Sequence, residues 1–331
     1  MRALLALATA LGLAVPFAPA VGAGTPPAQA QLAKRVIGNG TPSSCTSAAV
    51  VKAVAQGGSI TFDCGPKQKT IKMRATAKVV NTSRVVRIDG GGRVTLDGLG
   101  KRRILYQNTC DQRQTWTTDH CDDQQYPKLV VKGLTLRRGH ATGSDDESGS
   151  GGAIYARGGQ LVIADSTFAR NRCKSSGPDV GGGAVRALDQ WGDRPVRIDG
   201  STFRRGRCSN GSGLSSIGVS WQITDSVFTD NEATGRGANP ARPGTTGGGS
   251  GAAVYADGND FEIVVRNTRM EGNHAREGGG AIFFVSNDRS GHLTIVDSTL
   301  RDNPSDGFET IPGIFYLGRQ SRPTVTGSVV E

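Results

Sequence analysis

Aromatic residues are scarce in this chain of 331 residues. Phe, Tyr and Trp together make up 5% of it, and only 3 residues are Trp. A chain of this length is long enough to bury a sizeable core, so aliphatic side chains must supply most of that core. Gly is abundant at 48 residues, yet no strict triplet period occurs, which excludes a collagen-like chain.

Long apolar runs are absent beyond the N-terminus. The run from Ala3 to Phe17 follows Arg2 and is about 15 residues long, shorter than the ~20 residues that a membrane-spanning helix needs. Cleavage after Ala20 or Ala23 would suit a secretory signal peptide over residues 1–23, with a membrane anchor as the alternative. We then expect a polar linker over 24–43, a folded domain over 44–331, and a secreted protein that is either free or held at the cell surface.

The chain has no Cys-x-x-Cys pair and only 4 His, which argues against a structural zinc site. Its 6 cysteines are an even number in an exported chain, so disulfides are expected. Their order favours three local pairs among the several connectivities that are open. These pairs are Cys45–Cys64, Cys110–Cys121 and Cys173–Cys208.

Motifs for nucleophilic or nucleotide chemistry are also missing. No serine elbow, zinc motif or phosphate-binding loop occurs, and Gly90-Gly91-Gly92 precedes a strand-like segment where a nucleotide loop needs a helix. Lys and Arg exceed Asp and Glu, and the net charge is +10. The charge suits an acidic polysaccharide, an anionic cell wall or a membrane surface, or serves solubility alone. Nucleic acid is not expected, since no motif for it is present.

Two short phrases recur along the chain. One is Gly-Gly-Ala followed by Ile or Val, and the other is Asp-Ser-Thr-Phe-x-x-Asn. The segments between them are short and alternate in polarity, which predicts strands. Each copy carries one large apolar anchor, at Leu136, Phe168, Phe203, Phe228, Met270 and Leu300.

This pattern predicts an all-β, single-stranded right-handed parallel β-helix, a solenoid in which equivalent strands pair about 4.8 Å apart. The anchors should stack inside, and the recurring Asn should occupy a turn and bond to its neighbours. Asp165, Asp225 and Asp297 recur at one position and are interpreted as turn residues. Thr46 to Ala55 should form a short N-terminal helix that caps the stack, stapled by Cys45–Cys64 to the strand over 59–62.

The phrases Gly151-Gly152-Ala153-Ile154 and Phe168-Ala169-Arg170-Asn171 resemble the repeats of polymorphic outer membrane proteins, which are surface adhesins with a β-helix passenger. Together with Ile88-Asp89-Gly90, they are also similar to the pectate-lyase-like β-helix superfamily. The resemblance covers about residues 58 to 331 and implies a fold but no activity. No barrel-strand pattern follows the repeats, in contrast to the adhesins.

Arginine is the main clue to chemistry. Six arginines lie near equivalent positions of adjacent repeats: Arg137, Arg138, Arg170, Arg172, Arg204 and Arg205. Elimination from a uronic acid needs a cation beside the carboxylate and a base for the C5 proton. We therefore assign Arg138, Arg170, Arg205 and Asp189 as candidate catalytic residues and Arg137, Arg172 and Arg204 as substrate-binding residues. A solvated basic face is the alternative.

The Cys110–Cys121 loop carries Trp116 and His120, which we expect to bind substrate by stacking and proton transfer. His140 is a further candidate proton carrier, although lone histidines are commonly bystanders. If the repeats are in register, Asp257, Asp260 and Asp288 come close enough to bind Ca²⁺. Ordinary turn chemistry explains the same residues. Asp145, Asp146 and Glu147 form either another calcium site or a solvated loop.

Two functions stay open. One is an exported β-helix that binds an acidic polysaccharide and cleaves it as a lyase or a glycosidase would. The other is a non-catalytic adhesion or structural module of the same fold. Fold alone does not choose between them, because function depends on the site.

Overall fold

The computed structural model describes residues 32–115, 117–145 and 147–331. The predicted signal peptide, most of the first half of the predicted linker, Trp116 and Asp146 lie outside the described residues. Strand β1 (Lys34–Gly38) falls within the stretch expected to be a linker and pairs with β2 (Gly58–Asp63). The C-terminal part of that stretch therefore belongs to the fold.

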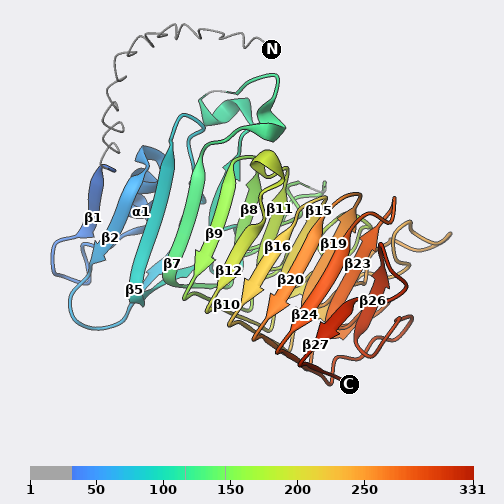
Figure 1. The fold of residues 1–331 in the computed structure, drawn as a ribbon. Helices are drawn as coiled ribbons and strands as arrows, with labels where there is room; N and C mark the ends of the chain where they lie inside the picture. The colour runs from blue at the N-terminus through green and yellow to red at the C-terminus, as the bar shows by residue number, and fades with distance from the viewer. Residues whose placement is uncertain (1–31, 116, 146) are drawn as a thin grey trace, which may run out of the picture. The chain divides into compact units, whose positions relative to one another are not determined.

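The described chain is all-β and predominantly parallel, which confirms the predicted class (Figure 1). Its strands form three sheets of 17, 8 and 3 strands. The 17-stranded sheet consists of two ladders, joined because β5 (Val85–Asp97) and β7 (Lys128–Arg137) are long enough to pair in both. One repeat is a passage through ladder 1, ladder 2 and the eight-stranded sheet.

Ladder 1 holds β1, β2, β5, β7, β9 (Gln160–Ala164), β12 (Val196–Asp199), β16 (Trp221–Thr224), β20 (Glu262–Arg266), β24 (His292–Val296) and β27 (Thr324–Thr326). Ladder 2 holds β3 (Lys69–Lys72), β5, β7, β10 (Thr167–Ala169), β13 (Thr202–Arg204), β17 (Val227–Thr229), β21 (Arg269–Glu271), β25 (Thr299–Arg301) and β28 (Val329–Val330).

The eight-stranded sheet holds β4 (Ala77–Lys78), β6 (Leu105–Asn108), β8 (Ile154–Arg157), β11 (Val185–Leu188), β15 (Leu214–Ile217), β19 (Val254–Gly258), β23 (Ile282–Ser286) and β26 (Ile314–Leu317). The small sheet holds β14 (Arg207–Cys208), β18 (Glu232–Ala233) and β22 (His274–Ala275). Short 3-10 helices η1 (Gln112–Gln114), η2 (Cys121–Asp123) and η3 (Trp191–Asp193) lie in the connections.

The predicted anchors stack in register along ladder 2. Phe168 pairs with Leu136 on one side and Phe203 on the other, and the column continues through Phe228 to Met270 and Leu300. The centroids of neighbouring Phe rings are 4.7 Å apart, and the planes differ by 5° and 7°. All six side chains are buried, so the column forms one side of a continuous core.

A second column consists of buried asparagines just past the anchors. Asn231 Nδ2 donates to Asn273 Oδ1, and Asn273 Nδ2 donates to Asn303 Oδ1, each at 2.8 Å. Asn273 Nδ2 also donates to the Phe228 carbonyl of the preceding repeat. The prediction that these amides bond to their neighbours is confirmed. Buried polar groups need such partners, because water cannot replace them.

The recurring aspartates occupy the turn between the two ladders. Asp165, Asp225 and Asp297 have φ values of 48°, 51° and 48°, in the left-handed region that favours Gly, Asn and Asp. The predicted role as turn residues is confirmed.

Helix α1 (Ser47–Gln56) caps the N-terminal end, as predicted. Thr46 precedes it, and its hydroxyl accepts from Ala49 N at 3.2 Å, as an N-cap should. Val50 and Val54 are fully buried against the first repeats. All three predicted disulfides are present. None of the helices in the described part of the chain is long and apolar enough to cross a membrane.

The asparagine column predicts a large, site-specific stability effect. Asn273→Ala should lower the free energy of unfolding by about 2–4 kcal/mol, because it leaves the buried backbone N–H and one side-chain amide hydrogen of Asn231 without an acceptor. Asn287→Ala is the control, since Asn287 is exposed and should cost less than about 1 kcal/mol. Urea denaturation followed by circular dichroism measures both, and equal effects would contradict a structural role for the column.

Candidate functional site

The turn that follows ladder 2 brings arginines from three successive repeats together. Arg138, Arg170 and Arg205 occupy equivalent positions, since Arg138 N donates to the Ala169 carbonyl and Arg170 N donates to the Arg204 carbonyl, each at 3.0 Å. A parallel column runs beside them, in which His140 pairs with Arg172 and Arg172 pairs with Arg207. Equivalent backbone positions in such ladders lie about 4.8 Å apart.

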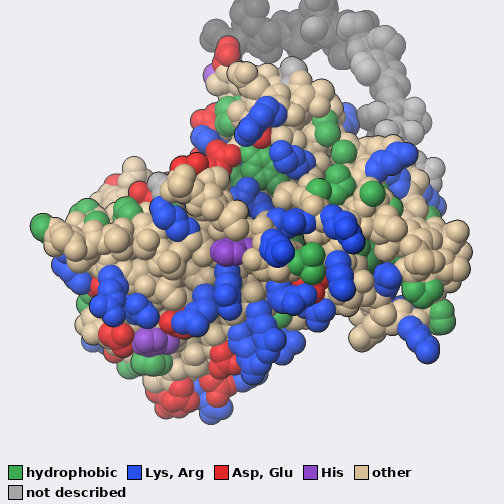
Figure 2. All heavy atoms as spheres, turned by 180° about the vertical axis from the view of Figure 1, so that it is seen from behind, with side chains coloured by type: hydrophobic (Ala, Val, Ile, Leu, Met, Phe, Trp, Pro, Cys, Tyr) green, Lys and Arg blue, Asp and Glu red, His purple; other side chains and the backbone are tan. Residues whose placement is uncertain are grey.

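We call the resulting face the arginine surface. Lys and Arg side chains gather with His beside them on the side opposite the view of Figure 1 (Figure 2). The arginine surface consists of Arg137, Arg138, Arg170, Arg172, Arg204, Arg205 and Arg207. It joins all six arginines that the sequence pointed to, with Arg207 in addition.

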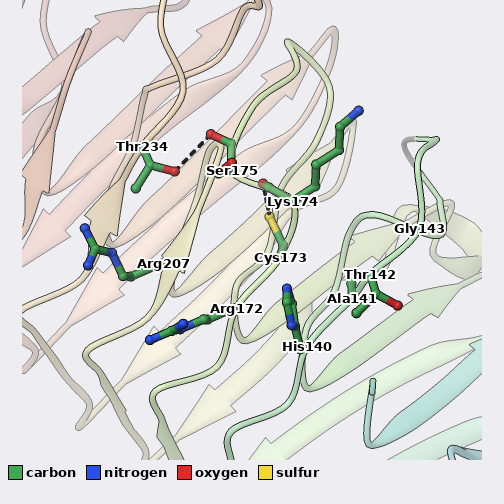
Figure 3. Close-up of a pocket in the computed structure, with 10 residues that line it drawn as sticks. All are labelled: His140, Ala141, Thr142, Gly143, Arg172, Cys173, Lys174, Ser175, Arg207 and Thr234. Atoms are coloured by element: carbon green, nitrogen blue, oxygen red, sulfur yellow. Dashed lines mark hydrogen bonds between the residues drawn. The ribbon is translucent and has the colours of Figure 1, made fainter. Parts of the chain in front are cut away.

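Two hollows lie within this surface. The first has a volume of about 320 Å³ and is lined by Arg137, Arg138, Arg170, Arg204 and Arg205, with Ala169 as its other lining residue. The second has a volume of about 550 Å³, and its ionisable side chains are His140, Arg172, Lys174 and Arg207 (Figure 3). No carboxylate lines either hollow, so both favour an anion.

Asp97 lies at one edge of the arginine surface. Its side chain is fully buried and accepts from Arg137 Nε at 2.9 Å and from Arg138 at 2.5 Å. Burial acts to raise the pKa of Asp97, but hydrogen bonds from Arg138, from Leu99 N and from Arg137 outweigh it, so the pKa is lowered. The carboxylate therefore stays ionised and fixes both guanidinium groups.

Acidic residues of the next repeat lie at the opposite edge of the arginine surface. Arg205 lies 3.5 Å from Asp230, and Arg207 lies 2.5 Å from Glu232. Beyond this point the turn position of the arginines holds Asp230, Gly272 and then Asp302. The basic face is thus confined to three repeats.

The arginines between the two edges have no acidic partner. Within the part of the chain that the structure describes, Arg170, Arg172 and Arg204 form no ion pair. Guanidinium groups suit carboxylates and sulfates because two parallel N–H donors match two oxygens. These three side chains are available to an external anion.

Three of the arginines also occupy an unfavourable backbone conformation. Arg138, Arg170 and Arg205 have φ values of 49°, 54° and 54°, a region that costs a residue with a Cβ about 1–2 kcal/mol. Later repeats place Asp or Gly there, which tolerate it better. The three clustered arginines thus keep a backbone conformation that other residue types would adopt at lower cost, which points to a functional role for their side chains.

His140 stands in the larger hollow beside Arg172 (Figure 3). Its Nδ1 lies 3.1 Å from the Gly100 carbonyl oxygen. A carbonyl only accepts, so Nδ1 carries the hydrogen and Nε2 of the neutral ring keeps its lone pair. The ring can therefore act as a proton acceptor.

Other predicted site residues lie elsewhere. Asp189 sits at the turn after the eight-stranded sheet and pairs with Arg157 at 2.6 Å, away from the arginine surface. His120 is exposed on the loop that follows β6, at the same kind of turn, and Trp116 of that loop lies outside the described residues. The structure does not bring Asp189 or His120 to the arginines.

The predicted calcium ligands are used in separate hydrogen bonds. Asp257 accepts from Tyr255, Asn239 and Asn287, whereas Asp288 accepts from Ser286 and Ser290, and Asp260 is exposed. Over residues 32–331, apart from 116 and 146, no group of three or more His, Cys, Asp or Glu side chains could hold a metal ion.

The acidic loop before the β8 strand is likewise engaged with the protein. Asp145 caps the backbone at Ser148 through a 2.6 Å bond, and the resulting hydrogen bonds lower its pKa. Glu147 accepts from the Tyr106 hydroxyl at 2.8 Å and from Asn108 at 3.0 Å. Both bonds draw Glu147 onto the eight-stranded sheet.

Sequence reasoning missed Asp97, Arg207 and Lys174. Arg207 and Lys174 each adjoin a cysteine of the Cys173–Cys208 disulfide, which joins two repeats at the larger hollow. That pairing was a signal that could have placed both residues beside Arg172. No protein-family model, curated protein or solved structure matches the chain.

The backbone conformation of Arg170 predicts a gain in stability when it is replaced. Arg170→Asn should raise the free energy of unfolding by about 0.5–1 kcal/mol, because Asn accepts a positive φ at lower cost. Arg204→Asn is the matched control, since Arg204 lies in strand β13 and should gain nothing. Thermal unfolding of both variants tests this, and a loss at Arg170 would show that the backbone is not strained there.

Proposed function

We propose that the protein is an exported right-handed parallel β-helix of the pectate-lyase-like type that binds an acidic polysaccharide on the arginine surface. The observation that carries the proposal is the run of arginines over three repeats, of which Arg170, Arg172 and Arg204 have no ion pair among the described residues. The three disulfides support an extracellular setting.

A polymer suits this surface better than a small molecule does. The cationic groups that line the two hollows recur from one repeat to the next. A chain lying along the stack meets new guanidinium groups at each repeat, so many weak contacts add up along its length. The acidic residues Asp230 and Glu232 limit the bound stretch to the basic repeats.

Binding should depend on the unpaired arginines. Replacing Arg170, Arg172 and Arg204 together by Gln should weaken binding to polygalacturonate or heparin about tenfold to a hundredfold, at about 0.5–1 kcal/mol for each lost ion pair. The control replaces Arg74, Arg266 and Arg322 by Gln, which removes the same charge from exposed positions elsewhere. Isothermal titration at two salt concentrations measures both proteins.

Equal weakening in the two triple variants would show that net charge alone attracts the polymer. Wild-type binding should also fall as salt is raised, because exposed charges are screened. A salt-independent affinity would contradict an electrostatic site.

Cleavage is the second candidate function, and the position of His140 favours it. In a β-elimination, the free Nε2 would take the C5 proton of a uronate unit while an arginine neutralises the carboxylate. The C5–H electron pair then forms the C4–C5 double bond. The C4–O glycosidic bond breaks with its electron pair on the leaving oxygen, which takes a proton from water as the neighbouring sugar is released.

Incubation with polyuronates tests this directly, because the unsaturated product absorbs in the ultraviolet. Wild-type protein should form product, whereas His140→Gln should form about a hundredfold less or none, as expected for loss of a general base. Binding of the polymer by His140→Gln should remain. If wild-type protein binds but yields no product over a panel of acidic glycans, a non-catalytic adhesion module is the better description.

A further inference from the structure

Each repeat turns a corner wherever the chain passes from one sheet or ladder to the next. The arginine surface lies at the corner that follows ladder 2, and a second charged region lies at the corner between the eight-stranded sheet and ladder 1. Two hollows adjoin there and share Gln190 and Arg194 as lining residues. Their volumes are about 160 Å³ and 210 Å³. In chain order, ladder 1 and ladder 2 both separate this corner from the arginine surface.

One hollow is cationic. Lys128, Arg194 and Arg197 line it together with Gln160, and no carboxylate does. The Arg194 guanidinium lies over the Trp191 ring at 4.5 Å from its centroid, which fixes its position. Among the described residues, none of the three cations has an ion pair.

The adjoining hollow is acidic. Its carboxylates come from Asp122 and Asp123 of η2 and from Asp189 and Asp193 around η3. Asp189 is engaged by Arg157, and Asp123 accepts from Gly192 N at 2.9 Å, which ties the two short helices together. Asp122 and Asp193 have no ion pair within the described chain.

Gln190 links the two hollows. It is 7% exposed, and its Nε2 donates to the Leu188 carbonyl at 3.1 Å. Its Oε1 has no hydrogen-bond partner among the described residues, although it belongs to a side chain that lines both hollows. Because Oε1 is not one of the fully buried atoms, it faces accessible space and can accept from a donor that a ligand supplies in place of water.

We propose that this corner is a second binding site, which takes a small zwitterion. The anionic group enters the cationic hollow beside Lys128 and Arg197, and the ammonium group enters the acidic hollow beside Asp122 and Asp193. An N–H of the ligand donates to Gln190 Oε1 between them. Amino sugars that carry a carboxylate and free amino acids share this chemistry. The site does not depend on the arginine surface or on its proposed ligand.

The test uses the full-length protein with Arg170, Arg172 and Arg204 replaced by Gln, so that the arginine surface contributes little. The probes are a glucuronate–glucosamine disaccharide with a free amino group, its N-acetylated form, and γ-aminobutyrate. Ligand-observed NMR titration gives each affinity. We expect the free-amine disaccharide to bind about fivefold more tightly than the N-acetylated one, which is the most that an exposed ion pair contributes.

Two double variants assign the contacts. Asp122→Asn with Asp193→Asn should abolish the preference for the free amine and leave binding of the N-acetylated form unchanged. Lys128→Gln with Arg197→Gln should weaken both disaccharides. Asn tolerates the positive φ of 53° at position 193, and thermal unfolding checks that each variant folds.

The outcomes separate the two sources of ligand and the two sites. Binding of γ-aminobutyrate alone, sensitive to both double variants, supports the site and identifies an amino acid as its ligand. Equal affinity for both disaccharides, no binding of any probe, or indifference to both double variants overturns the inference. None of these results bears on polymer binding by the arginine surface, which is measured with that surface intact.

Discussion

Everything in this structure depends on parallel strands that pair with their equivalents one repeat away. In this arrangement a residue lies directly over its counterpart, so one choice repeated in sequence becomes a column in space. The Phe168–Phe203–Phe228 column fills the core in this way. The asparagine column satisfies the backbone beside it, and its amides also bond to one another.

The same constraint generates the arginine surface, at an energetic cost. Like charges placed opposite each other in neighbouring strands repel, and Arg172 pairs directly with Arg207. The protein offsets this repulsion at the edges, through Asp97 on one side and Asp230 and Glu232 on the other. The middle of the surface is not offset by any described carboxylate. A bound anion would reduce that repulsion. The loss of repulsion among the arginines would therefore contribute to the free energy of binding.

How far the sequence predicts this molecule depends on whether a feature repeats. The anchors, the turn aspartates and the asparagine column recur in nearly every repeat, and each was predicted because its recurrence is visible. The disulfides were predicted because their partners are near in sequence. The arginines of adjacent repeats also came together for this reason.

Some site residues were predicted to lie together and do not. Predicting their positions would have required knowing which corner of the repeat each residue occupies. Asp189 was grouped with the arginines, but it follows the eight-stranded sheet, whereas Arg170 follows ladder 2. Asp97 was overlooked because its partner Arg138 lies 41 residues away. Insertions of different length separate the repeats, so sequence distance does not report the corner.

The corners are where this fold can vary its chemistry. Side chains that point inward from the strands are held by neighbours above and below, and a change at Phe203 or Asn273 affects several repeats at once. A turn residue packs against fewer neighbours, which is why equivalent turn positions of different repeats hold Arg170, Asp230 and Gly272. Charged residues can therefore occur together at turn positions, and two corners carry different sets of them. One is basic over three repeats, and the other places opposite charges side by side. The stacked core therefore sets where binding chemistry lies, and the turns set which ligand it suits.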